Sequence, residues 1–91
     1  MGLNAKIRNT SKALDRIMGG MAYVNSWIAQ RIALHVATFG KNRPEILENA
    51  IVGLRSDLEK LSARAVEVAG NLQTMRCRRG MVRSWKRHAN S

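Results

Sequence analysis

The chain lacks several features that would place it in common classes of small protein. It has a single cysteine, Cys77, in 91 residues, so an internal disulfide is impossible and a disulfide-stapled secreted scaffold is excluded. Its longest stretch without a charged residue, Ile17 to Gln30, is too short to cross a bilayer and contains polar residues and glycines. We therefore expect an intracellular protein of a reducing compartment, with no transmembrane helix.

Residues that could support catalysis or metal binding are also scarce. His35, His88 and Cys77 lie far apart in the sequence and do not have the spacing of a zinc site. A glycine-rich phosphate loop is missing, because Gly19 and Gly20 are not followed by the required lysine. Five of the six acidic residues are scattered over residues 45–67 of one predicted helix, where we expect them to act as helix-dipole partners and in ion pairs and not as a paired acid and base. In a chain long enough for only one small domain, these absences predict no enzyme, no metal and no cofactor.

Negative charge is sparse, and positive charge is unevenly distributed. Sixteen Lys and Arg residues against six Asp and Glu residues give a formal net charge of +10. Residues 1–43 contain seven basic and one acidic side chain, residues 44–75 three and five, and residues 76–91 six and none. A nearly neutral central segment between two basic arms predicts a scaffold that presents positive charge to an acidic partner.

The clearest structural pattern is a heptad repeat in the central segment. Apolar residues recur at alternating spacings of four and three, which predicts a helix over 44–76 that pairs with another helix in a left-handed coiled coil. Asn42 is the expected cap, and Pro44 suits the first turn. The stripe is also the predicted protein interface. Its residues are Leu47, Ile51, Leu54, Leu58, Leu61, Ala65, Val68, Leu72 and Met75.

The N-terminal half predicts a second helix, over about residues 3–38. The same spacing runs from Leu3 to Ile28, and Ile32, Val36 and Phe39 are expected to continue it on a shifted stripe. Two glycines at 19–20 predict a kink or a break. An alternating strand at 32–36 is the competing interpretation, but the chain has no second strand to pair with it.

These elements predict an all-α fold: a long helical hairpin, or a three-helix arrangement if the chain breaks at 19–20. Residues 1–75 form the expected hairpin and assembly region, and residues 76–91 form a basic C-terminal tail. Two helices make a thin core, so we expect a homo- or hetero-oligomer or docking into a larger assembly.

The tail is the strongest candidate binding segment, because arginine grips phosphate with two hydrogen bonds and Trp85 suits stacking on an unpaired base. The first helix adds a basic ridge, in which residues 8, 12 and 16 share one face. We predict non-enzymatic contact with nucleic-acid backbone, RNA in a ribonucleoprotein above all, with little sequence preference. The predicted contact residues are Arg76, Arg78, Arg79, Arg83, Trp85, Lys86, Arg87 and His88 of the tail and Lys6, Arg8, Lys12 and Arg16 of the ridge.

Several alternatives stay open at this stage. The tail is also interpretable as a disordered solubilising segment. As a helix, it would carry Cys77, Met81 and Trp85 on one face, a pattern typical of peripheral contact with anionic membranes. The chain would then be an accessory subunit of a membrane-associated or secretion-type complex whose basic ends meet lipid or acidic protein. The basic, amphipathic first twenty residues also resemble an organelle transit peptide, which would move the compartment from cytoplasm to organelle matrix.

Overall fold

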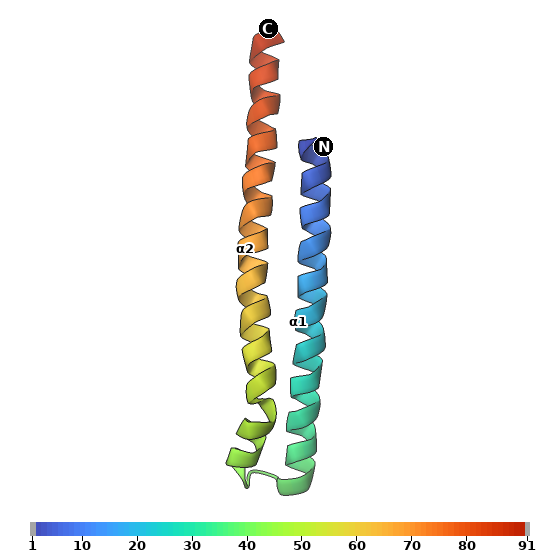
Figure 1. Ribbon diagram of the computed structural model, residues 1–91, viewed down its shortest axis with the longest axis vertical. Helices are drawn as coiled ribbons and strands as arrows, with labels where there is room; N and C mark the ends of the chain where they lie inside the picture. The colour runs from blue at the N-terminus through green and yellow to red at the C-terminus, as the bar shows by residue number, and fades with distance from the viewer. Residues whose placement is uncertain (1, 91) are drawn as a thin grey trace.

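The computed structural model describes residues 2–90, with side chains for residues 2–81. It consists of two long helices, α1 (Leu3–Phe39) and α2 (Pro44–Asn90), which run antiparallel beside each other (Figure 1). The principal-axis extents are 71 × 17 × 16 Å, so the molecule is a rod. The predicted all-α helical hairpin is confirmed.

Helix α1 passes through Gly19 and Gly20 without a break, so the three-helix alternative is wrong. Each glycine costs a helix interior about 1 kcal/mol relative to alanine, which packing against a long neighbouring helix readily offsets. Gly20 lies beside α2: a Cβ built on it would be 3.7 Å from Leu61 Cδ1. Helix–helix packing therefore holds the segment helical where local propensity is weakest.

The connection between the helices uses two residues with positive φ. Gly40 (φ 61°) ends α1 and donates its N–H to the Val36 carbonyl at 2.9 Å. Arg43 (φ 55°) directly precedes Pro44, the first residue of α2, and its carbonyl accepts a hydrogen bond from the N–H of Ile46 at 3.1 Å. The expectation that Asn42 caps α2 is wrong, because Arg43 occupies the cap position.

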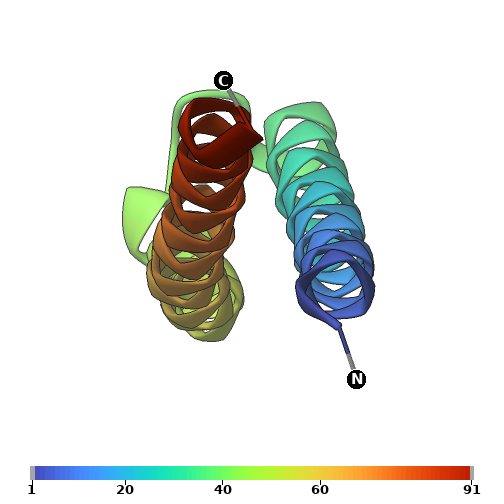
Figure 2. The same ribbon diagram turned by 90° about the horizontal axis from the view of Figure 1, so that it is seen from above.

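The stripe of nine residues on α2 lies on the side that packs against α1. Ile51, Val68 and Leu72 are buried, and the other six are half-buried. On α1 the half-buried and buried positions from Leu3 to Ile28 keep the same spacing. Seen end-on, each helix is covered by the other on one side only (Figure 2). The apolar stripes of α1 and α2 thus meet along a line of contact, which we call the seam. The two helices cover the seam from either side, and it stays open along both edges.

The expected shifted stripe near the turn is wrong at two of its three positions. Ile32 and Val36 are 39% and 57% exposed, whereas His35 is buried and Phe39 half-buried. His35 occupies the seam position because its ring also forms a hydrogen bond to the turn: the Nε2–H donates to the Asn42 carbonyl at 2.9 Å. The ring centroids of His35 and Phe39 are 5.0 Å apart. A polar side chain therefore continues the seam where the sequence pattern favoured apolar ones.

Helix α2 extends to Asn90, not to residue 76 as predicted. The segment contains arginine, methionine and lysine, which are good helix formers. Gly80 lowers the stability of this helix by only about 1 kcal/mol relative to alanine. No proline ends the helix. The C-terminal turns of α2 continue past the N-terminus of α1, as Figure 1 shows at the free end of the rod.

A candidate nucleic-acid interface at the free end

The hairpin brings the two basic segments of the sequence to the same end of the rod. The N-terminal turns of α1 lie beside residues 75–79 of α2. Arg79 Nη1 donates to Asn4 Oδ1 at 3.4 Å, and the Thr10 hydroxyl lies 3.8 Å from Met75 Sδ. Residues 65 to 75 positions apart in the chain are therefore neighbours here. The ridge of α1 and the start of the tail form one composite surface, which we call the basic end.

Seven predicted contact residues have described side chains at the basic end, and six are exposed; Arg79 is half-buried. Within residues 2–81 the ion pairs are Arg55–Glu48 at 2.9 Å and Arg64–Glu67 at 3.5 Å, and neither involves these seven. None of the seven thus forms an ion pair with a described carboxylate. The seven are Lys6, Arg8, Lys12, Arg16, Arg76, Arg78 and Arg79.

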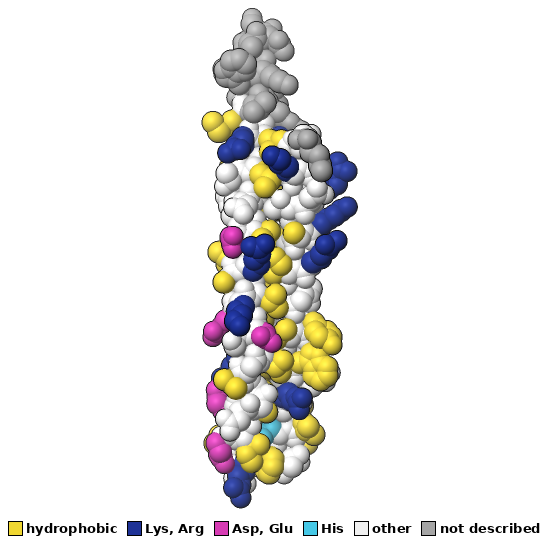
Figure 3. All heavy atoms as spheres, viewed as in Figure 1, with side chains coloured by type: hydrophobic (Ala, Val, Ile, Leu, Met, Phe, Trp, Pro, Cys, Tyr) yellow, Lys and Arg dark blue, Asp and Glu magenta, His cyan; other side chains and the backbone are white. Residues whose placement is uncertain are grey.

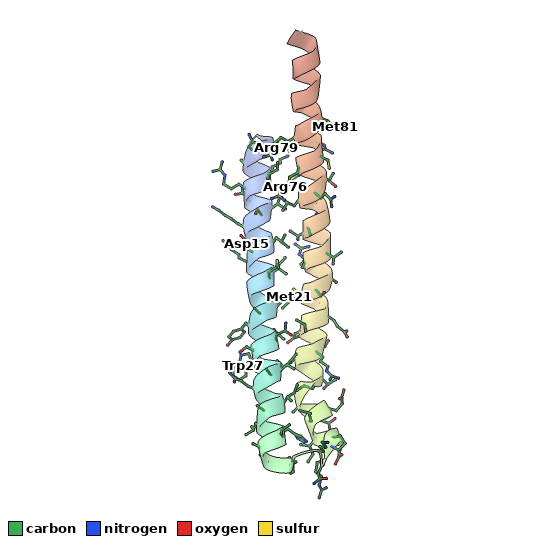
Figure 4. The ribbon with its side chains drawn as sticks, turned by 180° about the vertical axis from the view of Figure 1, so that it is seen from behind. Asp15, Met21, Trp27, Arg76, Arg79 and Met81 are labelled. Carbon is green, nitrogen blue, oxygen red and sulfur yellow. The ribbon has the colours of Figure 1, made fainter. Side chains whose placement is uncertain are left out.

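The basic side chains of α2 point in more than one direction. Arg76 and Arg79 lie on the side of α2 that faces α1, whereas Met81 lies on the opposite side (Figure 4). Met81 is 72% exposed, and Cys77, four residues earlier, is exposed as well. A shallow hollow of about 580 Å³ between Gly70 and Met81 follows this outer face. The start of the tail therefore carries Arg76 and Arg79 toward α1, whereas Arg78 lines the outer hollow together with Cys77 and Met81.

The remaining predicted tail contacts lie outside the residues with described side chains. These are Arg83, Trp85, Lys86, Arg87 and His88. The backbone of the segment that carries them is the last part of α2. The interpretation of the tail as a disordered segment is wrong for residues 76–90, whose backbone is helical.

Charge is divided along the length of the rod. Residues 17–67, which form the half near the turn, contain six basic and five acidic side chains. Residues 1–16 and 68–91, which form the free half, contain ten basic and one acidic side chain, Asp15. In Figure 3 the acidic side chains lie along α2 toward the turn, and basic side chains gather on α1 near the free end. Nearly all the net charge thus belongs to one half of the molecule.

The predicted protein interface is directed into the hairpin. All nine stripe residues are at least half-buried on the side of α2 that meets α1. The heptad pattern predicts a partner helix for this stripe, and in the structure that partner is α1 of the same chain. Contact of this stripe with another subunit stays a prediction. Another subunit could reach the stripe only along the open edges of the seam.

The sequence reasoning missed a second surface, at the turn end of the rod. Tyr23, Trp27 and Leu34 are 66%, 40% and 62% exposed on the outer side of α1. The Tyr23 and Trp27 rings meet edge to face, with centroids 6.1 Å apart. The signal was present in the sequence, since Arg31 is the one charged residue between 17 and 39. A helix with so little charge has apolar side chains on more than its buried face.

Within the part of the chain that the structure describes, neither helix contains an apolar stretch that could span a bilayer, and no three His, Cys, Asp or Glu side chains are grouped to hold a metal ion. Comparison with protein-family models, with curated proteins and with solved structures finds no match to this chain.

Proposed function

We propose that this protein is a non-enzymatic subunit of a larger assembly that binds the phosphate backbone of nucleic acid, RNA in particular, through its basic end. The observation that carries the proposal is the convergence of two basic segments, distant in sequence, on one end of a rod whose other half is nearly neutral. The heptad seam between the helices acts as a coiled coil that holds the two segments in register.

Phosphate is the ligand that best accounts for this end. Like charges four residues apart on one helix, as at Arg8, Lys12 and Arg16, repel one another unless an anion lies between them. Asp15 is the one carboxylate among residues 2–16, and within residues 2–81 it forms no ion pair with these side chains; an arginine fork, by contrast, donates two hydrogen bonds to the oxygens of a phosphate. Neutralising several phosphates releases condensed counterions, which gives strong, salt-sensitive binding with little base preference.

RNA is favoured over duplex DNA by the composition of the tail. Trp85 stands between Arg83 and Lys86 in the sequence, and aromatic side chains stack readily on unpaired bases, which RNA loops and ends provide. The last ten residues of α2 extend about 15 Å beyond the hairpin as a single helix. A direct comparison of single-stranded RNA with duplex DNA tests this preference.

The test compares two triple variants with the same net charge. In the ridge variant, Arg8, Lys12 and Arg16 are replaced by glutamine; in the control, Arg55, Lys60 and Arg64 of central α2 are replaced. Both lower the net charge from +10 to +7. Affinity for labelled single-stranded RNA is measured by fluorescence anisotropy at several salt concentrations.

We expect the ridge variant to lose affinity and its log–log salt slope to fall by up to about 2, since each lost phosphate contact removes about 0.7 on single strands. The control keeps most of its affinity and slope, because Arg55 and Arg64 are already paired with Glu48 and Glu67. Equal losses in both variants would mean that only net charge matters, and the proposal of a localised interface would be abandoned. Circular dichroism verifies that both variants stay helical.

Anionic lipid is the second candidate, because Cys77 and Met81 are exposed on the face of α2 turned away from α1. A helix with an apolar stripe in a basic field lies readily on a charged membrane surface. Flotation with vesicles of phosphatidylserine and phosphatidylcholine at moderate salt distinguishes the two. If Met81→Gln abolishes flotation and RNA binding is absent in the parent, lipid replaces RNA as the ligand.

A further inference from the structure

The turn half of the rod carries an exposed apolar surface that the proposed function does not use. Tyr23, Trp27 and Leu34 form a flank on α1, and Trp27 projects away from α2 (Figure 4). Figure 3 shows a hydrophobic cluster on α1 in this half of the molecule. Tryptophan and tyrosine are the residues that most often dominate binding energy at protein interfaces. We call these three residues the aromatic flank.

A groove adjoins the aromatic flank where α1 meets the start of α2. It has a volume of about 200 Å³, and its walls come from both helices, including Leu34, Phe39, Ile46 and Leu47. Ile46 is 43% exposed, so apolar surface continues from the flank across the groove. A protruding tryptophan and a hollow on the same face are what a two-fold interface requires, because each copy then offers both.

The rod also exposes far more surface than a compact chain of its mass. Its accessible area is 7176 Å², against about 5,300 Å² for a globular monomer of 10.2 kDa. The excess of about 1,900 Å² exceeds the roughly 800 Å² that one partner buries in a standard interface. The radius of gyration is 20.9 Å, whereas a compact domain of 91 residues has about 12 Å. There is ample area for a second rod to cover.

Charge restricts where a second copy can approach. The free halves, with ten basic and one acidic side chain each, repel one another, whereas the turn halves, with six and five, do not. The aromatic flank and the groove both lie in the turn half. An antiparallel arrangement overlaps the turn halves and directs the two basic ends away from each other. A parallel arrangement would place the basic ends side by side.

We infer that a second copy of this chain docks antiparallel on the aromatic flank, with Trp27 of each copy seated in the turn-end groove of the other. This names the protein partner that the proposed assembly role requires, and rests on that role. Trp27 lies 12 residues before Phe39, about 18 Å from the turn, and the groove is centred near His35, about 6 Å from the turn, so the two 71 Å rods overlap by roughly 24 Å. The dimer is then about 120 Å long.

The experiment measures mass and length in solution. Light scattering after size exclusion gives the mass, and small-angle X-ray scattering gives the maximum dimension. We expect a dimer of about 120 Å. A monomer at all accessible concentrations overturns the inference, whatever else the flank binds. A dimer no longer than the 71 Å of one rod overturns the antiparallel geometry.

Variants locate the interface. Trp27→Ala is expected to raise the dimer dissociation constant about 30-fold or more, as truncation of a central aromatic anchor does. The control, Val36→Ala, removes an apolar side chain that is 57% exposed on the same helix and lies outside both the flank and the groove, and should leave the constant unchanged. A dimer insensitive to Trp27→Ala would refute the assignment. Circular dichroism of both variants establishes that α1 is intact.

The same variants separate this inference from the proposed function. Trp27→Ala should lose the dimer and keep RNA contact, because the basic end is at the other end of the rod. The ridge variant, with Arg8, Lys12 and Arg16 changed to glutamine, should lose RNA and keep the dimer. Absence of RNA binding in the parent chain, with the dimer present, therefore refutes only the proposed function, and absence of the dimer in the parent chain, with RNA binding present, refutes only the docking surface.

Discussion

Replacing the two consecutive glycines of α1 with alanine should stabilise the hairpin. Alanine is favoured over glycine in a helix interior by about 1 kcal/mol per position. A Cβ at Gly19 meets no atom within 4 Å, so Gly19→Ala should show this helix effect alone. A Cβ at Gly20 meets Leu61 Cδ1 at 3.7 Å, an ordinary van der Waals contact, so Gly20→Ala should gain slightly more by burying a methyl group.

The double variant is therefore expected to gain about 2 kcal/mol, which for a chain of this size corresponds to a Tm higher by roughly 8–16 °C. The assay is thermal and urea unfolding followed by circular dichroism, at one protein concentration for all variants because association shifts Tm. A lower Tm for Gly20→Ala, with Gly19→Ala stabilised, would show that α2 approaches α1 too closely there for a methyl group. A lower Tm for both would show that the segment needs glycine for a bend, contrary to the continuous helix.

Three further changes test the seam and the turn by the same unfolding assay. Ile51→Ala should lower the free energy of unfolding by about 2–4 kcal/mol, because Ile51 is 1% exposed. Val52→Ala, at a neighbouring exposed position, should change the free energy of unfolding by less than about 0.5 kcal/mol, and equal effects of the two variants would contradict the orientation of α2. Arg43→Gly should raise the free energy of unfolding by about 1 kcal/mol, since glycine reaches a φ of 55° without steric cost. A lower free energy of unfolding would argue that the Arg43 side chain itself stabilises the turn. His35→Ala should lower it by about 2 kcal/mol through loss of the hydrogen bond to Asn42 and of ring packing, and an unchanged stability would remove the role of this side chain in closing the turn.

Much of the fold was predictable because one physical signal dominates the sequence. Apolar spacing from Leu47 to Met75 can bury a face only against another helix, and the short link at 40–44 makes the chain's own N-terminal half the nearest one. Once the hairpin is predicted, the proximity of the ridge to the start of the tail follows from chain direction.

The parts that were not predictable depend on small energy differences or on contacts across the fold. The end of α2 depends on whether Gly80 outweighs its helix-forming neighbours, a difference of about 1 kcal/mol. The seam position of His35 depends on a hydrogen bond to a backbone carbonyl seven residues away, which no local pattern encodes. The aromatic flank was visible as Tyr23 and Trp27, but only the observed packing shows that both stay outside the seam.

The separation of charge along a 71 Å rod has a kinetic consequence. A molecule with one strongly cationic half and one nearly neutral half has a large electric dipole moment along its axis. In the field of a polyanion such a rod turns before it touches, so that productive collisions begin with the correct end foremost. The rate of association should consequently depend on ionic strength more steeply than the rate of dissociation.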